Sequence, residues 1–177
     1  MSEDFGLSRQ LPAFPYTPTG KLLLLPFDAL QATISLLKSA EGLEACVFWY
    51  GHRGVDSDIV TAVRAPRQKG TRFNYHVDEA SMSMMSSTLS EEVRPLAQVH
   101  SHPGPMVEHS RYDDEMISSR RALSIVFPRY GHVTGPWPAG IGIHEWQAGY
   151  WYLLETSYAA ERVKVIRASG VSVEDLR

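Results

Sequence analysis

Residues 96–113 read Leu-Ala-Gln-Val-His-Ser-His-Pro-Gly-Pro-Met-Val-Glu-His-Ser-Arg-Tyr-Asp. The stretch from Leu96 to Val99 predicts a strand that leads into His100. The Pro-Gly-Pro run at 103–105 predicts a turn, and Ser110 is a typical first residue of a helix. A strand, a turn and a helix in this order bring side chains that are far apart in the sequence to one place.

The chemically informative pattern in this stretch is His-x-His, seven residues, then Ser-x-x-Asp. His100 and His102 are two residues apart at a strand end, so their side chains point to the same side. Asp113 is three residues after Ser110 and shares its face of the predicted helix. Two imidazoles and one carboxylate leave a coordination position open, which indicates catalytic zinc rather than a closed structural site.

Two local alternatives accompany this pattern. Ser110-x-x-Asp113 is also the signature of a helix capping box, and the two interpretations are compatible because a helix N-terminus suits an oxyanion donor. Asp114 offers a second carboxylate beside Asp113. The three-residue step from Ser110 selects Asp113 as the metal ligand.

Outside this stretch, apolar periodicity predicts a mixed α/β fold. Phe27, Leu30, Ile34 and Leu37 form one stripe of a helix over residues 27–40. A second helix follows Asp78 and carries Met82, Met85 and Leu89 as core residues, and a third runs from Ser110 to about Arg121. Strands are predicted at 45–50, 58–63, 72–77, 96–99, 123–127, 141–146, 150–154 and 163–166. We therefore expect a central mixed β-sheet flanked by about three helices.

The length of 177 residues suits one domain with one sizeable core. Pro12, Pro15, Pro18 and Gly20 predict an irregular Pro-rich leader at 1–20. The expected domain covers residues 21–168, and residues 169–177 are expected to form a C-terminal tail.

Composition narrows the class of partner. Seventeen basic and 20 acidic residues give a formal net charge of −3 without a block of like charge, so neither nucleic acid nor a membrane is the expected partner. The apolar run at 22–25 ends at Pro26 and is too short for a signal peptide or a membrane span. The single cysteine, Cys46, cannot form an internal disulfide and is expected to be a small buried hydrophobic residue. The predicted location is the cytoplasm.

His100, His102, Ser110 and Asp113 match the motif of the JAMM/MPN metalloprotease family without a gap, and the small size resembles its prokaryotic JAB branch. The resemblance implies a peptidase with one zinc ion held by His100, His102 and Asp113. It also implies that Glu44, at the start of the strand after the first long helix, shuttles a proton, and that Ser110 stabilises the oxyanion. Glu41 is the alternative to Glu44.

The resemblance further implies a substrate class. Many members cleave after the C-terminal glycine of ubiquitin or a ubiquitin-like protein, and prokaryotic relatives occur beside E1-like and E2-like proteins, some in anti-phage systems. Removal of lysine conjugates and processing of a precursor, such as a sulfur-carrier protein, both fit the sequence. A non-catalytic MPN-type scaffold subunit is the alternative from another class.

Residues outside the motif have simpler interpretations. The other five histidines, His52, His76, His109, His132 and His144, are expected to be solvent-facing or hydrogen-bonded. Trp137, between two prolines, either lines a substrate channel or packs against the scaffold.

Overall fold

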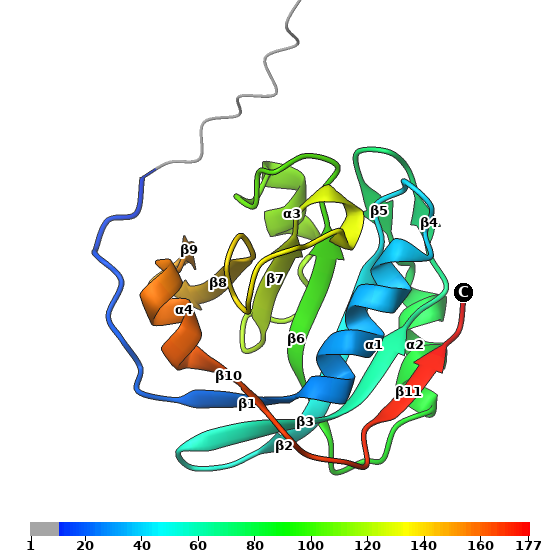
Figure 1. Cartoon of the computed structure of the whole chain (residues 1–177), viewed down its shortest axis with the longest axis horizontal. Helices are drawn as coiled ribbons and strands as arrows, with labels where there is room; N and C mark the ends of the chain where they lie inside the picture. The colour runs from blue at the N-terminus through cyan, green and yellow to red at the C-terminus, as the bar shows by residue number, and fades with distance from the viewer. Residues whose placement is uncertain (1–10) are drawn as a thin grey trace, which may run out of the picture.

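In the computed structural model, which describes residues 11–177, a curled mixed β-sheet is covered by helices on both faces (Figure 1). The strand order is β10-β1-β3-β2-β6-β7-β8-β9, and β11 also pairs with β3. The strands are β1 (Leu22–Pro26), β2 (Cys46–Arg53), β3 (Ser57–Ala65), β6 (Arg94–Ser101), β7 (Leu123–Phe127), β8 (Gly142–Gln147), β9 (Tyr150–Leu153), β10 (Val163–Ile166) and β11 (Ser172–Asp175). The α/β fold class expected from the sequence is confirmed.

The helices are α1 (Phe27–Lys38), α2 (Glu79–Ser87), α3 (Arg111–Met116) and α4 (Thr156–Arg162), with a short 3-10 turn at Arg129–Gly131. A separate two-stranded sheet pairs β4 (Lys69–Gly70) with β5 (Tyr75–His76). None of the helices in the described part of the chain has the length and apolar character needed to cross a membrane.

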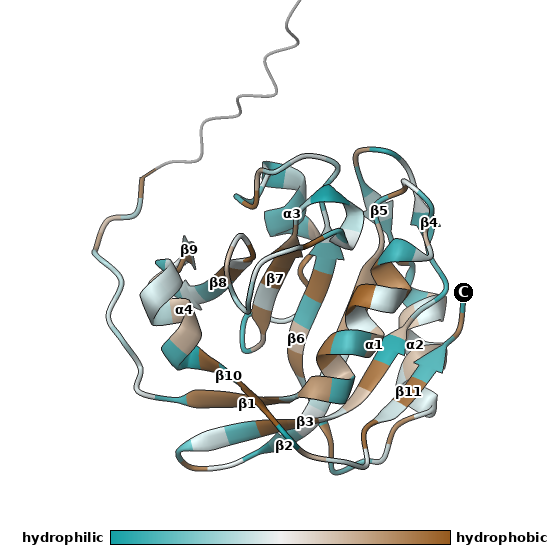
Figure 2. Ribbon diagram, viewed as in Figure 1, coloured by the Kyte–Doolittle hydropathy of each residue, from teal (hydrophilic) through white to brown (hydrophobic). Residues whose placement is uncertain are grey.

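Strand β2 shows how the core is divided between the two faces of the sheet. Val47 and Trp49 point into the larger cluster beneath α1, whereas Cys46, Phe48 and Tyr50 point into a smaller cluster beneath α2. This alternation follows from the period of two along a strand, and burial on both faces explains the continuous apolar run. Figure 2 shows the hydrophobic colouring along the central strands.

Helix α1 is fixed to β2 by a buried polar contact as well as by apolar packing. Trp49 Nε1 donates a hydrogen bond to Thr33 Oγ1 at 2.7 Å, and Thr33 in turn donates to the carbonyl of Ala29. Phe27, expected on the buried stripe, is instead half exposed at the first helical position.

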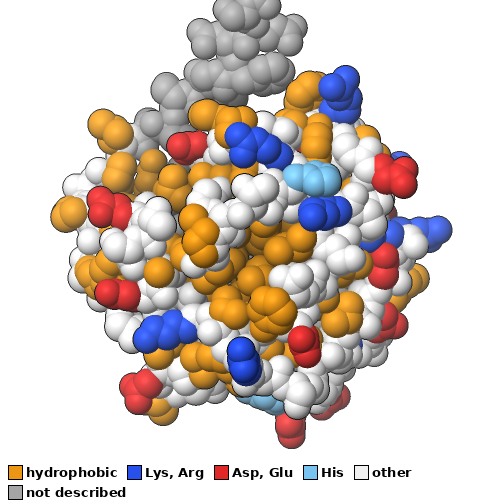
Figure 3. All heavy atoms as spheres, in the orientation of Figure 1, with side chains coloured by type: hydrophobic (Ala, Val, Ile, Leu, Met, Phe, Trp, Pro, Cys, Tyr) orange, Lys and Arg blue, Asp and Glu red, His pale blue; other side chains and the backbone are white. Residues whose placement is uncertain are grey.

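In the view of Figure 3, hydrophobic side chains gather in the middle of the visible face.

Two predicted elements are shorter in the structure than expected. The helix expected from Ser110 to Arg121 ends at Met116, because the Gln98 side chain binds the carbonyl of Met116 and the amide of Ser118. The strand expected at 72–77 is reduced to β5, since the Thr71 hydroxyl accepts hydrogen bonds from Phe73 and Asn74 and holds a turn.

The helix count and the chain ends also differ from expectation. Residues 11–177 contain four α-helices rather than about three, because α4 was not predicted. Residues 172–175, expected in a tail, form β11 and pair in parallel with β3. In the segment expected as a leader, the Tyr16 hydroxyl donates to Glu145 at 2.6 Å, and residues 1–10 lie outside the described part.

The sheet places one connection where a site is expected. Strands β6 and β7 are parallel neighbours, and the chain between them contains α3. Ligand sites in such units form beyond the carboxyl ends of the strands. His100 and His102 lie at this end of β6, which runs upward to α3 in Figure 1.

Candidate metal centre

The two histidines are fixed by the end of β6. His100 is fully buried, opposite Cys46 of β2 and Val126 of β7. His102 follows the strand, and its backbone amide donates to the carbonyl of Phe127 at 2.8 Å. Their Nε2 atoms lie 3.1 Å apart. The structure therefore brings the two imidazoles together, as the spacing of two residues predicts.

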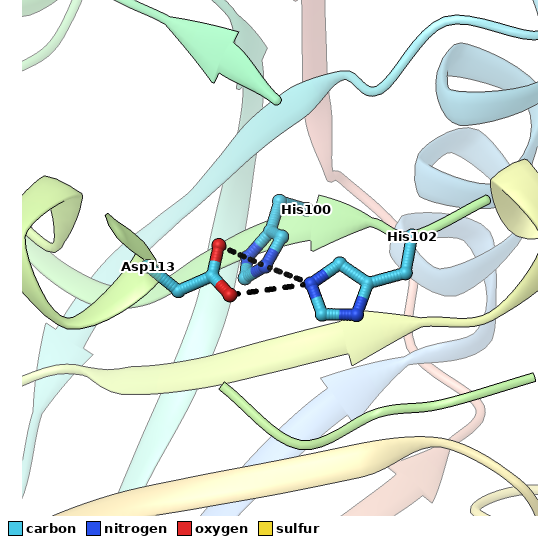
Figure 4. Close-up of side chains that lie close together, drawn as sticks. All are labelled: His100, His102 and Asp113. Carbon is cyan, nitrogen blue, oxygen red and sulfur yellow. Dashed lines mark hydrogen bonds and ion pairs between the residues drawn. The ribbon is translucent and has the colours of Figure 1, made fainter. Parts of the chain in front are cut away.

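Asp113 reaches the same point from α3. The Ser110 side chain accepts the Asp113 amide, and Asp113 Oδ2 accepts the Ser110 amide at 2.6 Å and its hydroxyl at 2.7 Å. The capping box is thus present together with the metal-ligand geometry. Asp113 Oδ1 lies 3.2 Å from His100 Nε2, and Oδ2 lies 3.4 Å from His102 Nε2 (Figure 4).

These three side chains could hold a metal ion. Each offers one ligand atom, and the three atoms lie within 4.8 Å of one another. His102 Nδ1 lies 3.0 Å from the carbonyl of Met106, a contact that requires a proton on Nδ1. The lone pair of His102 is therefore on Nε2 and directed at the other two groups, the orientation that a metal-binding imidazole needs.

The protonation states also suit a cation. Burial lowers the pKa of His100, and Asp113 only partly offsets this effect. For Asp113, burial opposes ionisation, but the hydrogen bonds and charges of the two histidines hold the pKa of its carboxyl well below its usual range. Burial also opposes a charge on His102, whereas Asp113 and Glu44 raise the pKa of His102 overall. A neutral His100 beside an ionised Asp113 is the state that binds a metal ion.

Glu44 lies beside this group and is 4% exposed. Burial raises its pKa to about 8, with the charge of His102 acting against the shift and that of Asp113 adding to it. Glu41, the alternative, is exposed in the turn after α1, where its φ is 52°. The geometry therefore favours Glu44 over Glu41 as the carboxylate that faces the metal centre.

Ser101, which sequence reasoning did not single out, fixes the segment that carries Glu44. Its amide donates to the Ala45 carbonyl at 3.1 Å, and its hydroxyl accepts the Ala45 amide at 3.1 Å. A cavity of about 410 Å³ opens next to Glu44, with Leu43, Gln68 and Gly70 in its wall. Gly70 is required there, because a Cβ would lie 2.5 Å from the Glu44 carbonyl oxygen.

A second buried polar group lies next to the metal centre. His109 is hydrogen-bonded to Asp114 Oδ1 through Nδ1 and to Ser124 Oγ through Nε2, both at 2.8 Å. Its ring stacks on His144 at 3.7 Å, and His144 Nε2 binds the carbonyl of Val107 at 2.8 Å. Asp114 thus faces His109, whereas Asp113 faces the metal centre.

The hydrogen bonds of His109 help to hold helix α3 in place. Helix α3 has six residues, too few for stability without tertiary contacts. His109 connects its first turn to β7, and the Tyr112 hydroxyl connects it to the carbonyl of Tyr75 at 2.8 Å. We infer that these contacts fix the position of Asp113.

Two residues outside the motif can also be compared with expectation. Cys46 is buried, as expected. Trp137 packs against the core and donates to the Val163 carbonyl.

Comparison with known proteins agrees with this geometry. Residues 26–146 match the family described as prokaryotic homologs of the JAB domain. The fold is similar to the solution structure of protein DSY2949 from Desulfitobacterium hafniense, with a TM-score of 0.63 and 13% identity over 83% of this chain and 94% of that chain. No curated protein matches the sequence.

We predict that His102→Ala or Asp113→Asn weakens binding of a divalent metal ion by more than about 100-fold, since even outer-shell changes cost about 10- to 100-fold. Calorimetric titration of the metal-free protein with Zn²⁺ or Co²⁺ measures this. The exposed His132→Ala is the matched control and keeps the affinity of the unaltered chain. In that chain, affinity falls as the pH is lowered, because a protonated His102 cannot bind a cation and Asp113 and Glu44 raise the pKa of His102 against the effect of burial.

We also predict that His109→Phe lowers metal affinity by about tenfold while the protein stays folded. Phenylalanine keeps a ring to stack on His144 but removes the hydrogen bonds to Asp114 and Ser124. The Co²⁺ absorption spectrum and a metal titration report on the centre, and circular dichroism reports on the fold. An unchanged spectrum and affinity in folded His109→Phe would show that Asp113 does not depend on this network.

Proposed function

Since the chain belongs to the prokaryotic homologs of the JAB domain, we propose that it is a zinc-dependent peptidase that cleaves after the C-terminal glycine of a ubiquitin-like protein. The observation that carries the proposal is the convergence of His100, His102 and Asp113 with the buried carboxyl of Glu44 beside them. Its proposed setting is the cytoplasm, in a ubiquitin-like conjugation or anti-phage system with E1-like and E2-like proteins.

The donor set supports zinc. Neighbouring ligands of a tetrahedral zinc ion with bonds of about 2.0–2.1 Å are about 3.3 Å apart. The two Nε2 atoms lie 3.1 Å apart, Asp113 Oδ1 lies 3.2 Å from His100 Nε2, and Asp113 Oδ2 lies 3.4 Å from His102 Nε2, all close to this spacing. His100, His102 and Asp113 would leave a coordination position open, and a zinc ion held there would supply Lewis-acid chemistry, making water acidic near pH 7 and polarising a carbonyl.

Glu44 supplies the proton transfers. It takes the proton that the attacking water loses as the water oxygen bonds to the scissile carbonyl carbon. It then passes that proton to the amine nitrogen as the carbon–nitrogen bond breaks. Burial raises the pKa of Glu44 to about 8 in the metal-free site, and a bound cation would favour the ionised carboxylate that accepts a proton.

Ser110 is placed to act on the carbonyl oxygen. It is exposed at the edge of the centre, and its hydroxyl lies 2.7 Å from Asp113 Oδ2. We propose that the hydroxyl turns from Asp113 toward the oxyanion as negative charge develops there. One donor of this kind contributes about 10²- to 10³-fold to a rate.

The surroundings suit an extended peptide. The cavity next to Glu44 has a volume of about 410 Å³ and is bounded by Leu43, Gln68 and Gly70. Phe73 and Met106 are exposed apolar residues on two loops tied to the site, the first through Tyr130 and the second through His102. Exposed apolar residues on loops tied to the site can contact the side chains of an extended peptide.

The first test is Glu44→Gln, which we expect to keep one zinc ion per chain and to lower the rate of cleavage of a ubiquitin-like fusion by about 10²- to 10⁴-fold. Glutamine has the same shape but cannot accept the proton. Glu41→Gln is the control and keeps full activity. Cleavage at the original rate by zinc-loaded Glu44→Gln would remove Glu44 from the mechanism.

The second test compares a linear fusion and a lysine-linked conjugate of the same ubiquitin-like protein. We expect the lysine-linked conjugate to be cleaved at least as fast, because the small residues at the cavity act on the glycine side of the bond. A strong preference for the linear fusion would assign the enzyme to precursor processing. No cleavage of either by zinc-loaded protein would favour the scaffold alternative.

A further inference from the structure

A basic hollow lies at the end of the sheet opposite the metal centre. It has a volume of about 240 Å³, and Ala122, Leu123 and Trp146 form part of its wall. Its charged residues are Lys21, Arg53, Arg120, Arg121 and Arg162, with Asp58 and Glu145. Five cations thus face two carboxylates, although the whole chain carries a net charge of −3.

The two carboxylates are already paired. Asp58 binds Lys21 at 3.0 Å, and Glu145 binds Arg162 at 2.8 Å. Within residues 11–177, no carboxylate forms an ion pair with Arg53, Arg120 or Arg121. Three guanidinium groups around one small space repel each other, so the hollow is poorly neutralised from within.

Several of these cations are held in place. Arg53 Nη2 donates to the carbonyls of Pro95 and Arg121, both at 2.9 Å. The Arg120 guanidinium lies over the Trp146 ring, 4.3 Å from its centre. These contacts organise the guanidinium groups before any ligand arrives.

Arg162 adds an unused donor. Its Nε and Nη2 are bound to Glu145, whereas its Nη1 is buried and has no hydrogen-bond partner among the residues that the structure describes. The residue as a whole is 9% exposed. A buried donor without a partner is uncommon in proteins, so a group outside residues 11–177 is the expected partner, and a bound ligand can supply it.

We propose that the basic hollow binds the phosphate group of a small molecule. Guanidinium groups match the oxygens of phosphate in pairs, and the hollow is of a size for one such group rather than for a large ligand. Beyond Arg120 and Trp146 lies a second hollow of about 420 Å³, in whose wall Tyr150 and Trp151 also lie. Aromatic walls next to a phosphate site suit the base of a nucleotide.

This site is separate from the proposed chemistry. Pro95, next to Arg53, and His100 are five residues apart on β6, which corresponds to roughly 17 Å along a strand. Loss of phosphate binding is therefore expected to leave metal binding unchanged.

The test is calorimetric titration of the full chain with inorganic phosphate and, in parallel, with adenosine monophosphate. We expect saturable binding with a dissociation constant below about 1 mM. The double variant Arg120→Gln/Arg121→Gln weakens it at least tenfold, and the charge-matched control Arg67→Gln/Arg167→Gln does not. Tighter binding of the nucleotide than of phosphate identifies a nucleotide as the source, and equal binding identifies free phosphate.

Phosphate can also bind a metal ion, so the titration is repeated with His102→Ala, in which binding to the hollow must persist. Loss of phosphate binding in His102→Ala would place the anion at the metal centre and overturn the proposal. So would the absence of saturable binding by the unaltered chain, or equal binding by the Arg120→Gln/Arg121→Gln variant.

Discussion

The register between β2 and β6 is the constraint on which the site depends. It sets Cys46 opposite His100, and the two hydrogen bonds between Ser101 and Ala45 extend this pairing by one step beyond the strand. Glu44 is the next residue, so its position beside the metal centre follows from the pairing. If β6 slipped by one residue against β2, every side chain of β6 would turn to the other face of the sheet. His100 would then no longer point to the metal centre.

The same pairing creates an electrostatic conflict. Two carboxyl groups, Glu44 and Asp113, are buried near one another, and two imidazole nitrogens lie 3.1 Å apart. Without a cation, burial raises the pKa of Glu44 to about 8, and the charge of Asp113 adds to this rise. A divalent cation would neutralise Asp113 and free Glu44 to exchange its proton. Conflicts of this kind are tolerated at functional sites because the ligand that resolves them is part of the function.

The parts of this structure that could be predicted from sequence are those that depend on neighbours in the chain. The strands at 123–127 and 163–166 and the cap at Asp78 follow from apolar runs and local hydrogen bonds, and the convergence of His100 and His102 follows from the period of a strand. The early end of α3 could not be predicted, because it depends on Gln98, a residue of another element. The roles of Glu44 and Ser110 in catalysis stay predictions.

The expectation that His109 is hydrogen-bonded is confirmed, but its contacts with Ser124 and His144 could not be predicted, because they depend on other elements of the sheet. His109 reads as a loop histidine until Ser124 and His144 are placed beside it by β7 and β8. The arginines of the basic hollow come from the ends of β2 and α4 and from the segment before β7. They do not form a block of like charge in the sequence, so the hollow could not be predicted from it. Strand β6 connects both regions. Arg53 binds the carbonyl of Pro95 near the start of the strand, and His100 lies near its end, at the metal centre. Because β6 is paired on both sides, it holds the basic hollow and the acidic metal centre at a fixed separation. That separation is roughly 17 Å along the strand, whereas salt screens exposed charges beyond about 8 Å.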